Sequence, residues 1–328
     1  MPVNLLEFSN GGGCGCKVDP LKLKQILGDY NSGSVDKILV DLTDRDDASV
    51  IEINSDFCLI QTLDFFLPIV NNPYDFGKIA AANALSDVYA MGGAPITALS
   101  ILGWPEQKLP IEFASQILEG AESICNQVGI SISGGHTVNT KEPLFGLSVN
   151  GTVKKEFLKR KNTCKIGDYL YITKPLGIGL LSNALQNDTL SEEGYSELLE
   201  ITCKLNILGT ELGTYSHVTA MTDITGFGFL GHLSEMLTNN RGAEVFLDNI
   251  PVIPNAIEIA KLMKYPNITT SNYNYIKDRT DGLNGVEFLW LCDPQTSGGL
   301  LFSSSEEMNI DGITLIGRVI TGNRIKLV

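Results

Sequence analysis

Segments typical of strands and helices alternate along most of this chain, and this alternation constrains its fold more than any other feature. The apolar run DFCLIQTLDFF, residues 56–66, has the length of a strand and ends at a Pro68 turn. The next stretch, KIAAANALSDVYAMGGAP, repeats apolar residues at helical spacing until Gly92, Gly93 and Pro95 end it. Strands followed by helices predict layered α+β domains, in which helices cover a sheet.

A charged segment near the middle of the chain separates two such alternating halves. The run KKEFLKRKN, residues 154–162, shows no apolar period and is the linker candidate. After it, GDYLYITKPLGIG starts a second unit, and TDITGFGFLGHLSEML, residues 222–237, is typical of a loop followed by a helix. The 328 residues are enough for two domains of common size. We therefore predict an N-terminal arm at 1–48, a first domain at 49–158 and a second domain at 159–328.

The charge balance argues against several classes of partner. Lysine and arginine number 24 and aspartate and glutamate 38, which leaves a net charge of −14. Such a chain repels nucleic acid and anionic membranes, so we expect neither as a partner. The N-terminus lacks the pattern of a signal peptide, and no run of about 18 apolar residues occurs, so we expect a cytoplasmic protein. If the protein handles phosphates, its own carboxylates should do so through metal ions.

The stretch GGGCGCK, residues 11–17, places two cysteines behind three glycines and ahead of a lysine. Three chemistries favour that arrangement: a metal clip, a phosphate-binding loop, or a reactive thiolate on a flexible arm. The stretch by itself favours the metal clip. The seven cysteines of the chain are odd in number and scattered, so they predict no disulfide framework.

Aspartates recur where strands or helices meet loops, at Asp46, Asp47, Asp64, Asp87 and Asp223. Mg²⁺ prefers a few carboxylate oxygens and leaves positions for phosphate and water, so such a set suits a phosphate-binding metal site. Taken singly, each aspartate is more often a helix cap, a turn residue or a solvated charge. Asp87 is harder to dismiss, because a carboxylate buried in an alanine-rich helix needs a partner or a cation.

The histidines and several absent motifs narrow the chemistry further. His136 follows a short strand and paired glycines in GGHT, where a phosphate or a base can approach closely, although a structural histidine fits as well. His217 and His232 have no neighbours that suggest chemistry. The chain has no HExxH, CxxC, GxSxG or GxxxxGK[ST] motif, which weakens the zinc protease, thioredoxin, serine hydrolase and Walker-loop interpretations.

Nine segments, taken in order, resemble the selenophosphate synthetase (selenide, water dikinase) family of the AIR synthase-related superfamily. They are GGGCGCK, RDDAS, TLDFFLPIV, NALSDVYAMGGAP, ILGWP, GGHT, TKPLGIG, AMTDITGFGFLGHL and LCDPQTSGGLL. The resemblance covers nearly the whole chain. It implies a two-domain, AIR synthase-like α+β fold with a flexible, glycine-rich N-terminal arm. In that fold the sheets of the N-terminal domain pair across a homodimer, and the C-terminal domain is an α/β sandwich.

The resemblance also implies a reaction. Members of the family make selenophosphate from selenide, ATP and water, and they release AMP and orthophosphate. Several Mg²⁺ ions act with ATP, and K⁺ is a common stimulant. The implied partners are therefore ATP, selenide or a selenium-delivery protein, and a second copy of the chain. The product would supply activated selenium for selenocysteine or for selenium-modified tRNA.

The same resemblance implies site residues position by position. Cys14 matches the catalytic cysteine, and Lys17 matches a lysine needed for activity. The Mg²⁺ ligands are matched by Asp47, Asp87 and Asp223. Nucleotide contacts are matched by Lys17, Asp44, Arg45, Asp46, Asp64 and Asp87, and from the partner chain by Gly135, His136 and Thr137. This chain departs from the common pattern at Leu63, where members often have threonine, and at Asp44, where a small or neutral residue is common.

Some roles stay open at this level. The glycines at 11–13 would let the arm close over the phosphates, with Lys17 favouring the thiolate of Cys14 or meeting the triphosphate. Cys16 is either an oxidation partner of Cys14 or a tolerated residue. The alternative functions are a kinase relative from the same superfamily and a non-catalytic metal or chalcogen carrier. The relatives lack the CGCK arm, and a Cys-Gly-Cys pair offers too few ligands for a closed zinc site.

Overall fold

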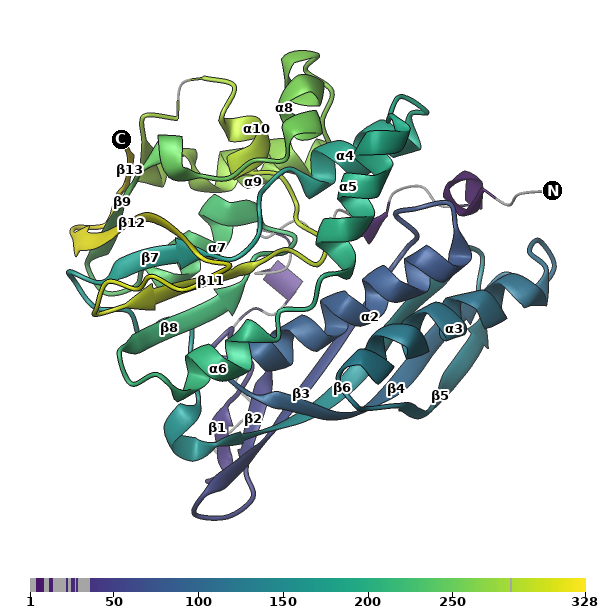
Figure 1. Cartoon of the computed structure of the whole chain (residues 1–328), viewed down its shortest axis with the longest axis horizontal. Coiled ribbons are helices and arrows are strands. Elements are labelled where there is room, and N and C mark those ends of the chain that lie inside the picture. Colours follow the sequence, from purple (N-terminus) through teal and green to yellow (C-terminus); the bar gives the residue numbers. More distant parts are fainter. Residues whose placement is uncertain are drawn as a thin grey trace.

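The computed structural model describes residues 4–8, 12–13, 22, 25–26, 28, 36–283 and 285–328, which form two β-sheets with helices packed on them (Figure 1). Cys14, Cys16 and Lys17 lie outside these described residues. No helix in the described ranges is both long and apolar enough to cross a membrane. The predicted α+β fold class is confirmed.

The first sheet has six strands in the order β1-β2-β3-β6-β4-β5. They are β1 (Ile38–Val40), β2 (Ser49–Glu52), β3 (Phe57–Phe66), β4 (Ala94–Trp104), β5 (Ile132–Asn139) and β6 (Leu144–Lys154). Neighbours are antiparallel except β4 and β5, which are parallel. Helices α2 (Pro73–Ala90) and α3 (Ile111–Gln127) cover one face, and we call this unit the first half (Figure 1). The segment expected as an arm at 1–48 thus contains strand β1 of this sheet.

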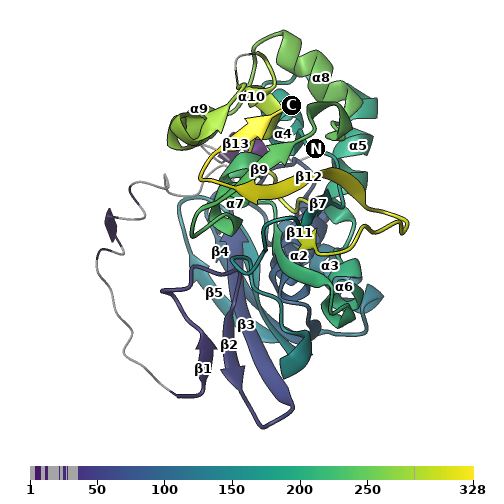
Figure 2. The same ribbon diagram turned by 90° about the vertical axis from the view of Figure 1, so that its left-hand side faces the viewer.

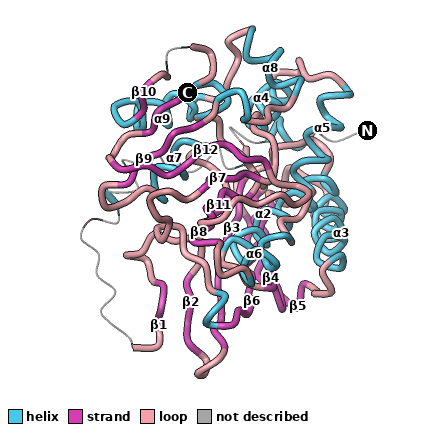
Figure 3. The backbone as a smooth tube through the Cα atoms, turned by 60° about the vertical axis from the view of Figure 1, so that its left-hand side comes forward, coloured by secondary structure: helices cyan, strands magenta, loops and turns pink. Residues whose placement is uncertain are grey.

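The second sheet, with its helices, makes up the second half of the molecule (Figures 2 and 3). Its seven strands, in the order β10-β13-β9-β12-β7-β11-β8, are β7 (Tyr169–Ile172), β8 (Val218–Asp223), β9 (Arg241–Val245), β10 (Thr280–Asp281), β11 (Leu300–Ser304), β12 (Thr314–Thr321) and β13 (Ile325–Leu327). Only β13 pairs in parallel, with β9 and β10, so this described sheet is mixed. The helices are α4 (Ile178–Gln186), α5 (Glu192–Cys203), α6 (Leu208–Thr214), α7 (Gly228–Met236), α8 (Pro254–Lys261), α9 (Asn267–Ile276) and α10 (Phe288–Leu291). Short 3₁₀ turns are η1 (Leu5–Phe8), η3 (Lys155–Phe157), η4 (Leu247–Asn249) and η5 (Lys277–Arg279).

Helix α2 lies on the side of the first half that faces the second half, and it is buried along nearly its whole length (Figure 1). Asn72 caps its first turn by accepting a hydrogen bond of 3.1 Å from the Asp75 backbone N–H, and Pro73 occupies a position that needs no N–H. In addition to the apolar side chains of α2, the polar side chains of Asn83 and Asp87 are buried. They are buried because α2 packs against α3 on one side and against α5, α6 and β8 on the other.

The charged segment at 154–162, which joins the two halves, is exposed at residues 154–156, but two of its later lysines are buried. Lys159 is buried, and its Nζ donates to two backbone carbonyls, both at 2.9 Å. Lys161 is buried too, and its Nζ lies 2.9 Å from Glu235 Oε2. These partners satisfy the ammonium groups, which is what allows lysines to lie inside the protein.

Candidate functional site

Four aspartates from four separate elements gather where the two halves meet; we call them the acidic cluster. Asp47 lies in the turn between β1 and β2, Asp64 in β3, Asp87 in α2 and Asp223 at the end of β8. Asp87 and Asp223 are buried, with exposed fractions of 8% and 2%. The structure therefore brings the three predicted metal ligands into one region with Asp64, a further predicted nucleotide contact.

Hydroxyl and amide groups hold three of these carboxylates in place. Each of the three accepts a hydrogen bond from a neutral side chain. The bonds run from Thr62 to Asp87, from Asn83 to Asp64 at 2.7 Å, and from Thr222 to Asp47 at 2.7 Å. None of the three donors was predicted from the sequence. The sequence could have indicated Thr62, because side chains two residues apart on a strand share a face. Thr62 lies two residues before Asp64 in β3 and so lies on the same face as that carboxylate.

Burial and mutual repulsion set the electrostatics of the acidic cluster. Burial raises the pKa of Asp87 well above its ordinary value, and the charges of Asp223, Asp64 and Asp47 raise it further. Burial also raises the pKa of Asp47, against the lowering effect of Lys161. The Oδ2 atom of Asp47 is buried and accepts no hydrogen bond from the described residues. A cation stabilises buried carboxylates that repel one another, and hard divalent ions match such oxygen donors.

The carboxylates are neighbours rather than a closed metal cage. Within the part of the chain that the structure describes, no three acidic, histidine or cysteine side chains stand close enough together to hold a metal by themselves. A cation at this cluster therefore needs further ligands, such as phosphate oxygens or water. Mg²⁺ is usually bound in proteins in that way.

Asp46 lies beside the cluster in the same turn as Asp47. Its carboxylate accepts hydrogen bonds from the backbone N–H groups of Asp47 at 3.1 Å and Lys161 at 3.3 Å. Burial raises the pKa of Asp46 to about 6, although the charge of Lys161 acts in the opposite direction. Asp46 thus fixes the turn against the segment that joins the two halves.

Asp44 and Arg45 complete this turn. The Asp44 carboxylate accepts a hydrogen bond of 2.9 Å from the Asp41 backbone N–H and lies 3.8 Å from Arg160 Nη1. Arg45 is exposed and has a φ of 55°, in the left-handed region. The Asp44 side chain is therefore engaged within the protein, whereas that of Arg45 faces solvent.

A polar network that was not predicted from the sequence supports the turn from the second half. Lys161 Nζ is paired with Glu235 Oε2, which lies 3.7 Å from His232 Nδ1. His232 Nε2 accepts a hydrogen bond of 3.1 Å from the Thr225 backbone N–H, two residues after Asp223. Because Nε2 accepts, the proton of a neutral ring lies on Nδ1, facing Glu235. The network links the turn that carries Asp46 to the segment that follows Asp223.

Lys174, from the TKPLGIG stretch, is buried in the second half. Its Nζ donates to the carbonyls of Lys204 at 2.6 Å and Ser297 at 2.9 Å. Burial lowers the pKa of Lys174 to about 7, although the charge of Asp223 raises it. Ser297 donates its backbone N–H to Asn83 Oδ1 at 2.8 Å. Lys174 therefore holds the loop before β11 against α2, next to the acidic cluster.

The stretch GGHT lies away from the cluster of the same chain. Gly135, His136 and Thr137 are exposed residues within the edge strand β5. The prediction that a strand ends before them is wrong, because pairing with β4 carries β5 on to Asn139. In the order β3-β6-β4-β5, three strand spacings, or about 14 Å, separate β5 from β3. One chain alone does not bring these residues to Asp64.

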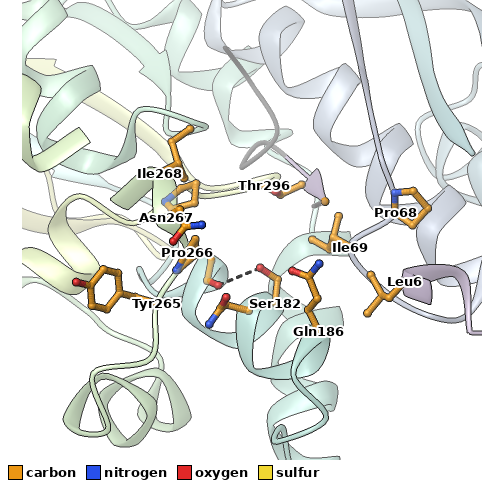
Figure 4. A pocket seen from close by; sticks show the side chains of 14 residues that line it. Leu6, Pro68, Ile69, Ser182, Gln186, Tyr265, Pro266, Asn267, Ile268 and Thr296 are labelled. Atoms are coloured by element: carbon orange, nitrogen blue, oxygen red, sulfur yellow. Dashed lines mark hydrogen bonds between the residues drawn. The ribbon is translucent and has the colours of Figure 1, made fainter. Parts of the chain in front are cut away.

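The described part of the N-terminal arm reaches the loop between β3 and α2. Gly13 donates its backbone N–H to the Leu67 carbonyl at 2.9 Å. Gly12, Ile69 and Thr296 help to line a cavity of about 200 Å³ between the halves, and none of its described lining residues is charged (Figure 4). A neutral cavity of this size does not suit a nucleoside triphosphate. The acidic cluster is therefore the better candidate for phosphate binding.

Two domain families match most of the chain. The AIR synthase related protein, N-terminal domain, matches residues 45–153, and the AIR synthase related protein, C-terminal domain, matches residues 165–328. A protein of Shewanella baltica (strain OS223) named "Selenide, water dikinase" is 43% identical over 316 residues, which are 96% of this chain and 90% of that protein. A protein of the same name from Shewanella sp. (strain MR-7) is 42% identical over the same shares.

Solved structures share the fold at low sequence identity. "AaThiL complexed with AMPPCP and TMP" has a TM-score of 0.68 at 20% identity and covers 93% of this chain and 91% of that one. The thiamine-monophosphate kinase of Stenotrophomonas maltophilia K279a has a TM-score of 0.66 at 18% identity, with 94% of each chain covered. The hydrogenase maturation protein HypE has a TM-score of 0.63 at 16% identity and covers 93% and 89%. At these identities the likeness concerns the fold alone.

Proposed function

The chain belongs to the selenide, water dikinase family, which makes selenophosphate from selenide, ATP and water, and we propose that its acidic cluster binds the phosphates in that reaction. The observation that carries this proposal is the meeting of Asp47, Asp87 and Asp223, each from a different element, between the two halves. Phosphoryl transfer depends mainly on positioning and on neutralising charge. The other products are AMP and orthophosphate, and the selenophosphate serves selenocysteine or selenium-modified tRNA.

Divalent cations, which we assign as several Mg²⁺ ions, would be held by Asp47, Asp87 and Asp223. The buried Oδ2 of Asp47 and the repulsion among the carboxylates fit an oxygen-preferring cation. When bound, such ions neutralise phosphate charge and help to orient the transferred group. The protein's own contribution is to hold the carboxylates in place through Thr62 and Thr222. We propose that K⁺ stimulates the reaction.

The nucleotide would be contacted by the turn at 44–46 and by β3. Asn83 orients Asp64 through its hydrogen bond of 2.7 Å, so that the carboxylate stays directed into the cluster region. Asp46 and Arg45 flank the same region, and the charged Asp44 side chain contributes by holding the turn. Asp87 would serve both the nucleotide and the metal ions.

The soft nucleophile would be handled by the cysteine-bearing stretch. We assign Cys14 as the catalytic cysteine that receives or orients selenium, delivered as selenide or by a selenium-delivery protein. Lys17 would favour the Cys14 thiolate or meet the triphosphate, since a nearby ammonium group lowers the pKa of a thiol. We assign Cys16 only the lesser role of an oxidation partner of Cys14.

We further propose that two copies pair through the open face of the first sheet. That face carries large exposed apolar side chains, namely Leu63 at 52%, Phe65 at 49%, Ile96 at 50% and Leu99 at 42% exposure. Apolar patches of this kind are typical of protein interfaces. In such a dimer, His136 of the partner subunit, with Gly135 and Thr137 of the partner subunit, would complete each nucleotide site.

The deciding experiment follows the phosphorus-containing products of ATP by ³¹P NMR, with and without selenide and Mg²⁺. We expect AMP, orthophosphate and selenophosphate only when both are present, and none of them from an Asp87→Asn variant. Accumulation of ADP would favour a kinase of the same superfamily. The absence of turnover, with selenide retained on the protein, would favour a carrier.

A further inference from the structure

Two glycines of the stretch GGGCGCK, Gly12 and Gly13, are tightly enclosed. At Gly12, a Cβ atom would lie 1.9 Å from the Pro68 carbonyl oxygen. At Gly13, it would lie 2.4 Å from Thr296 Oγ1 and 2.9 Å from Ile69 Cγ2. Real Cβ atoms essentially never approach other atoms within 3.0 Å, so neither position accepts a side chain without a shift. Figure 4 shows Thr296 and Ile69 close together at one side of the cavity.

The backbone of this segment is also held. Gly13 donates its N–H to the Leu67 carbonyl at 2.9 Å, and its φ of +58° lies in the left-handed region that favours glycine. Further upstream, Leu5 is fully buried, and the Leu6 backbone N–H donates to Asn71 Oδ1 at 3.3 Å. Leu6 and Gly13 are therefore held at opposite ends of the loop that joins β3 to α2.

The groups that enclose the glycines are connected to the acidic cluster within a few residues. The β3–α2 loop begins just after the strand that carries Asp64, and it leads into the helix that carries Asn83 and Asp87. Thr296 directly precedes Ser297, whose backbone N–H donates to Asn83 Oδ1. Contacts from both halves thus place Gly13 relative to the carboxylates.

We propose that Leu67, Pro68 and Thr296 hold Gly12 and Gly13 as a fixed anchor, which positions the segment carrying Cys14 relative to the acidic cluster. Thr296 is the residue of the second half that encloses Gly13. In this proposal the two glycines serve close approach, in place of the hinge that the sequence suggested. The inference rests on the proposed role of Cys14.

The first test compares Gly13→Ala with Gly312→Ala. Gly312 also has a positive φ, +83°, but nothing lies within 4 Å of a Cβ placed there, so it reports the conformational strain alone. We expect both variants to lower the urea midpoint of unfolding, and Gly13→Ala at least as much as Gly312→Ala, because it adds the clash with Thr296 to the conformational strain. Only Gly13→Ala should lower kcat for selenide-dependent AMP formation, at least tenfold, with KM for ATP changed less than twofold. A Gly13→Ala kcat equal to that of Gly312→Ala overturns the proposal.

A second test asks whether Thr296 is the obstacle. Adding Thr296→Ala to Gly13→Ala removes the Oγ1 atom that crowds the new methyl group and should restore kcat at least threefold. Adding Thr296→Ser keeps Oγ1 and should restore nothing. Equal recovery in both double variants, or recovery in neither, overturns the assignment of Thr296.

Cys14→Ser, assayed beside these variants, separates the anchor from the function that it serves. Full activity of Cys14→Ser overturns both the proposed role of the thiol and the anchor that positions it. An inactive Cys14→Ser together with a Gly13→Ala variant as active as Gly312→Ala overturns the anchor alone. An inactive Cys14→Ser together with the expected loss in Gly13→Ala supports both.

Discussion

The Thr222 hydroxyl donates a hydrogen bond of 2.7 Å to Asp47 Oδ1, across 175 residues of sequence and between the two halves of the molecule. This bond lowers the pKa of Asp47 against the raising effects of burial and of the neighbouring charges of Asp46 and Asp223. Because Thr222 directly precedes Asp223 in β8, one strand end supplies one carboxylate of the cluster and orients another. The acidic cluster therefore depends on how the two halves pack.

Replacing Thr222 by valine removes this hydrogen bond and keeps the shape of the side chain. A hydrogen bond to a charged group contributes about 1.5–3 kcal/mol. We expect the Mg²⁺ concentration for half-maximal activity to rise about tenfold, which corresponds to about 1.4 kcal/mol. The measurement is a Mg²⁺ titration of selenide-dependent AMP formation.

Thr269→Val is the matched control for this change. Thr269 is fully buried, and its Oγ1 has no hydrogen-bond partner among the described residues. Its replacement should leave the Mg²⁺ dependence unaltered. A Thr222→Val variant that behaves like Thr269→Val would contradict the predicted role of the hydroxyl.

Asp87→Asn should stabilise the protein and inactivate it. The pKa of Asp87 is raised by burial and by three neighbouring carboxylates, so its charge opposes folding when no cation is bound. We expect the free energy of unfolding in EDTA at about pH 8 to rise by about 1–2 kcal/mol. The exposed Asp311→Asn is the control, with no expected change. Urea unfolding measures the effect, and an Asp87→Asn variant less stable than Asp311→Asn would argue against it.

The pH dependence of stability should carry the signature of Asp46. Its pKa rises from 3.8 to about 6 on folding, so between these values the folded state binds more protons than the unfolded state. The free energy of unfolding therefore falls as the pH rises through this window, and the stabilising contribution is lost above about pH 6. In EDTA, the free energy of unfolding of the unsubstituted protein minus that of Asp46→Asn should decrease from about pH 4 to about pH 7. Urea midpoints across this range measure it, and a difference that increases with pH would refute the assignment.

Lys174→Met and Lys159→Met should separate a role at the cluster from burial alone. Both ammonium groups donate to two backbone carbonyls, of Lys204 and Ser297 for Lys174 and of Tyr215 and Val218 for Lys159. Each variant leaves one buried and one partly buried carbonyl without these bonds, so each should lose about 1–3 kcal/mol of stability. Only Lys174→Met should also lower kcat, about tenfold, because it releases the Ser297 loop. Steady-state kinetics and urea unfolding decide the point, and equal kcat values in the two variants would contradict it.

Mixing two inactive variants should restore activity if the nucleotide site is shared between subunits. Asp87→Asn and His136→Ala would disable opposite sides of the site. A random mixed population would therefore regain about a quarter of full activity, from heterodimers with one intact site. Asp87→Asn mixed with Asp47→Asn should regain none, because both changes lie on the same side. The measurement is AMP formation after subunit exchange, with heterodimers verified by native mass spectrometry, and no recovery in verified heterodimers would rule out the shared site.

Much of the fold was predictable from the sequence. The alternation of strand and helix segments indicates two covered sheets, and nine segments in order indicate the family; both predictions are confirmed. These features are local, because the period of a strand or helix and the spacing of a motif are written into neighbouring residues. The aspartates could be singled out in the same way, since each lies at the end or on the face of a predicted element.

Only the tertiary structure decided which groups surround those aspartates. The bond from Thr222 to Asp47 and the one from Ser297 to Asn83 join residues 175 and 214 apart in sequence, which no local pattern specifies. The enclosure of Gly13 by Thr296 likewise exists only because the two halves pack together. Burial and hydrogen bonding depend on what another part of the chain places opposite a residue. The sequence by itself therefore determined the elements and their candidate residues, and the packing of the two halves determined their environment, because that packing alone excludes water and brings distant donors to the carboxylates.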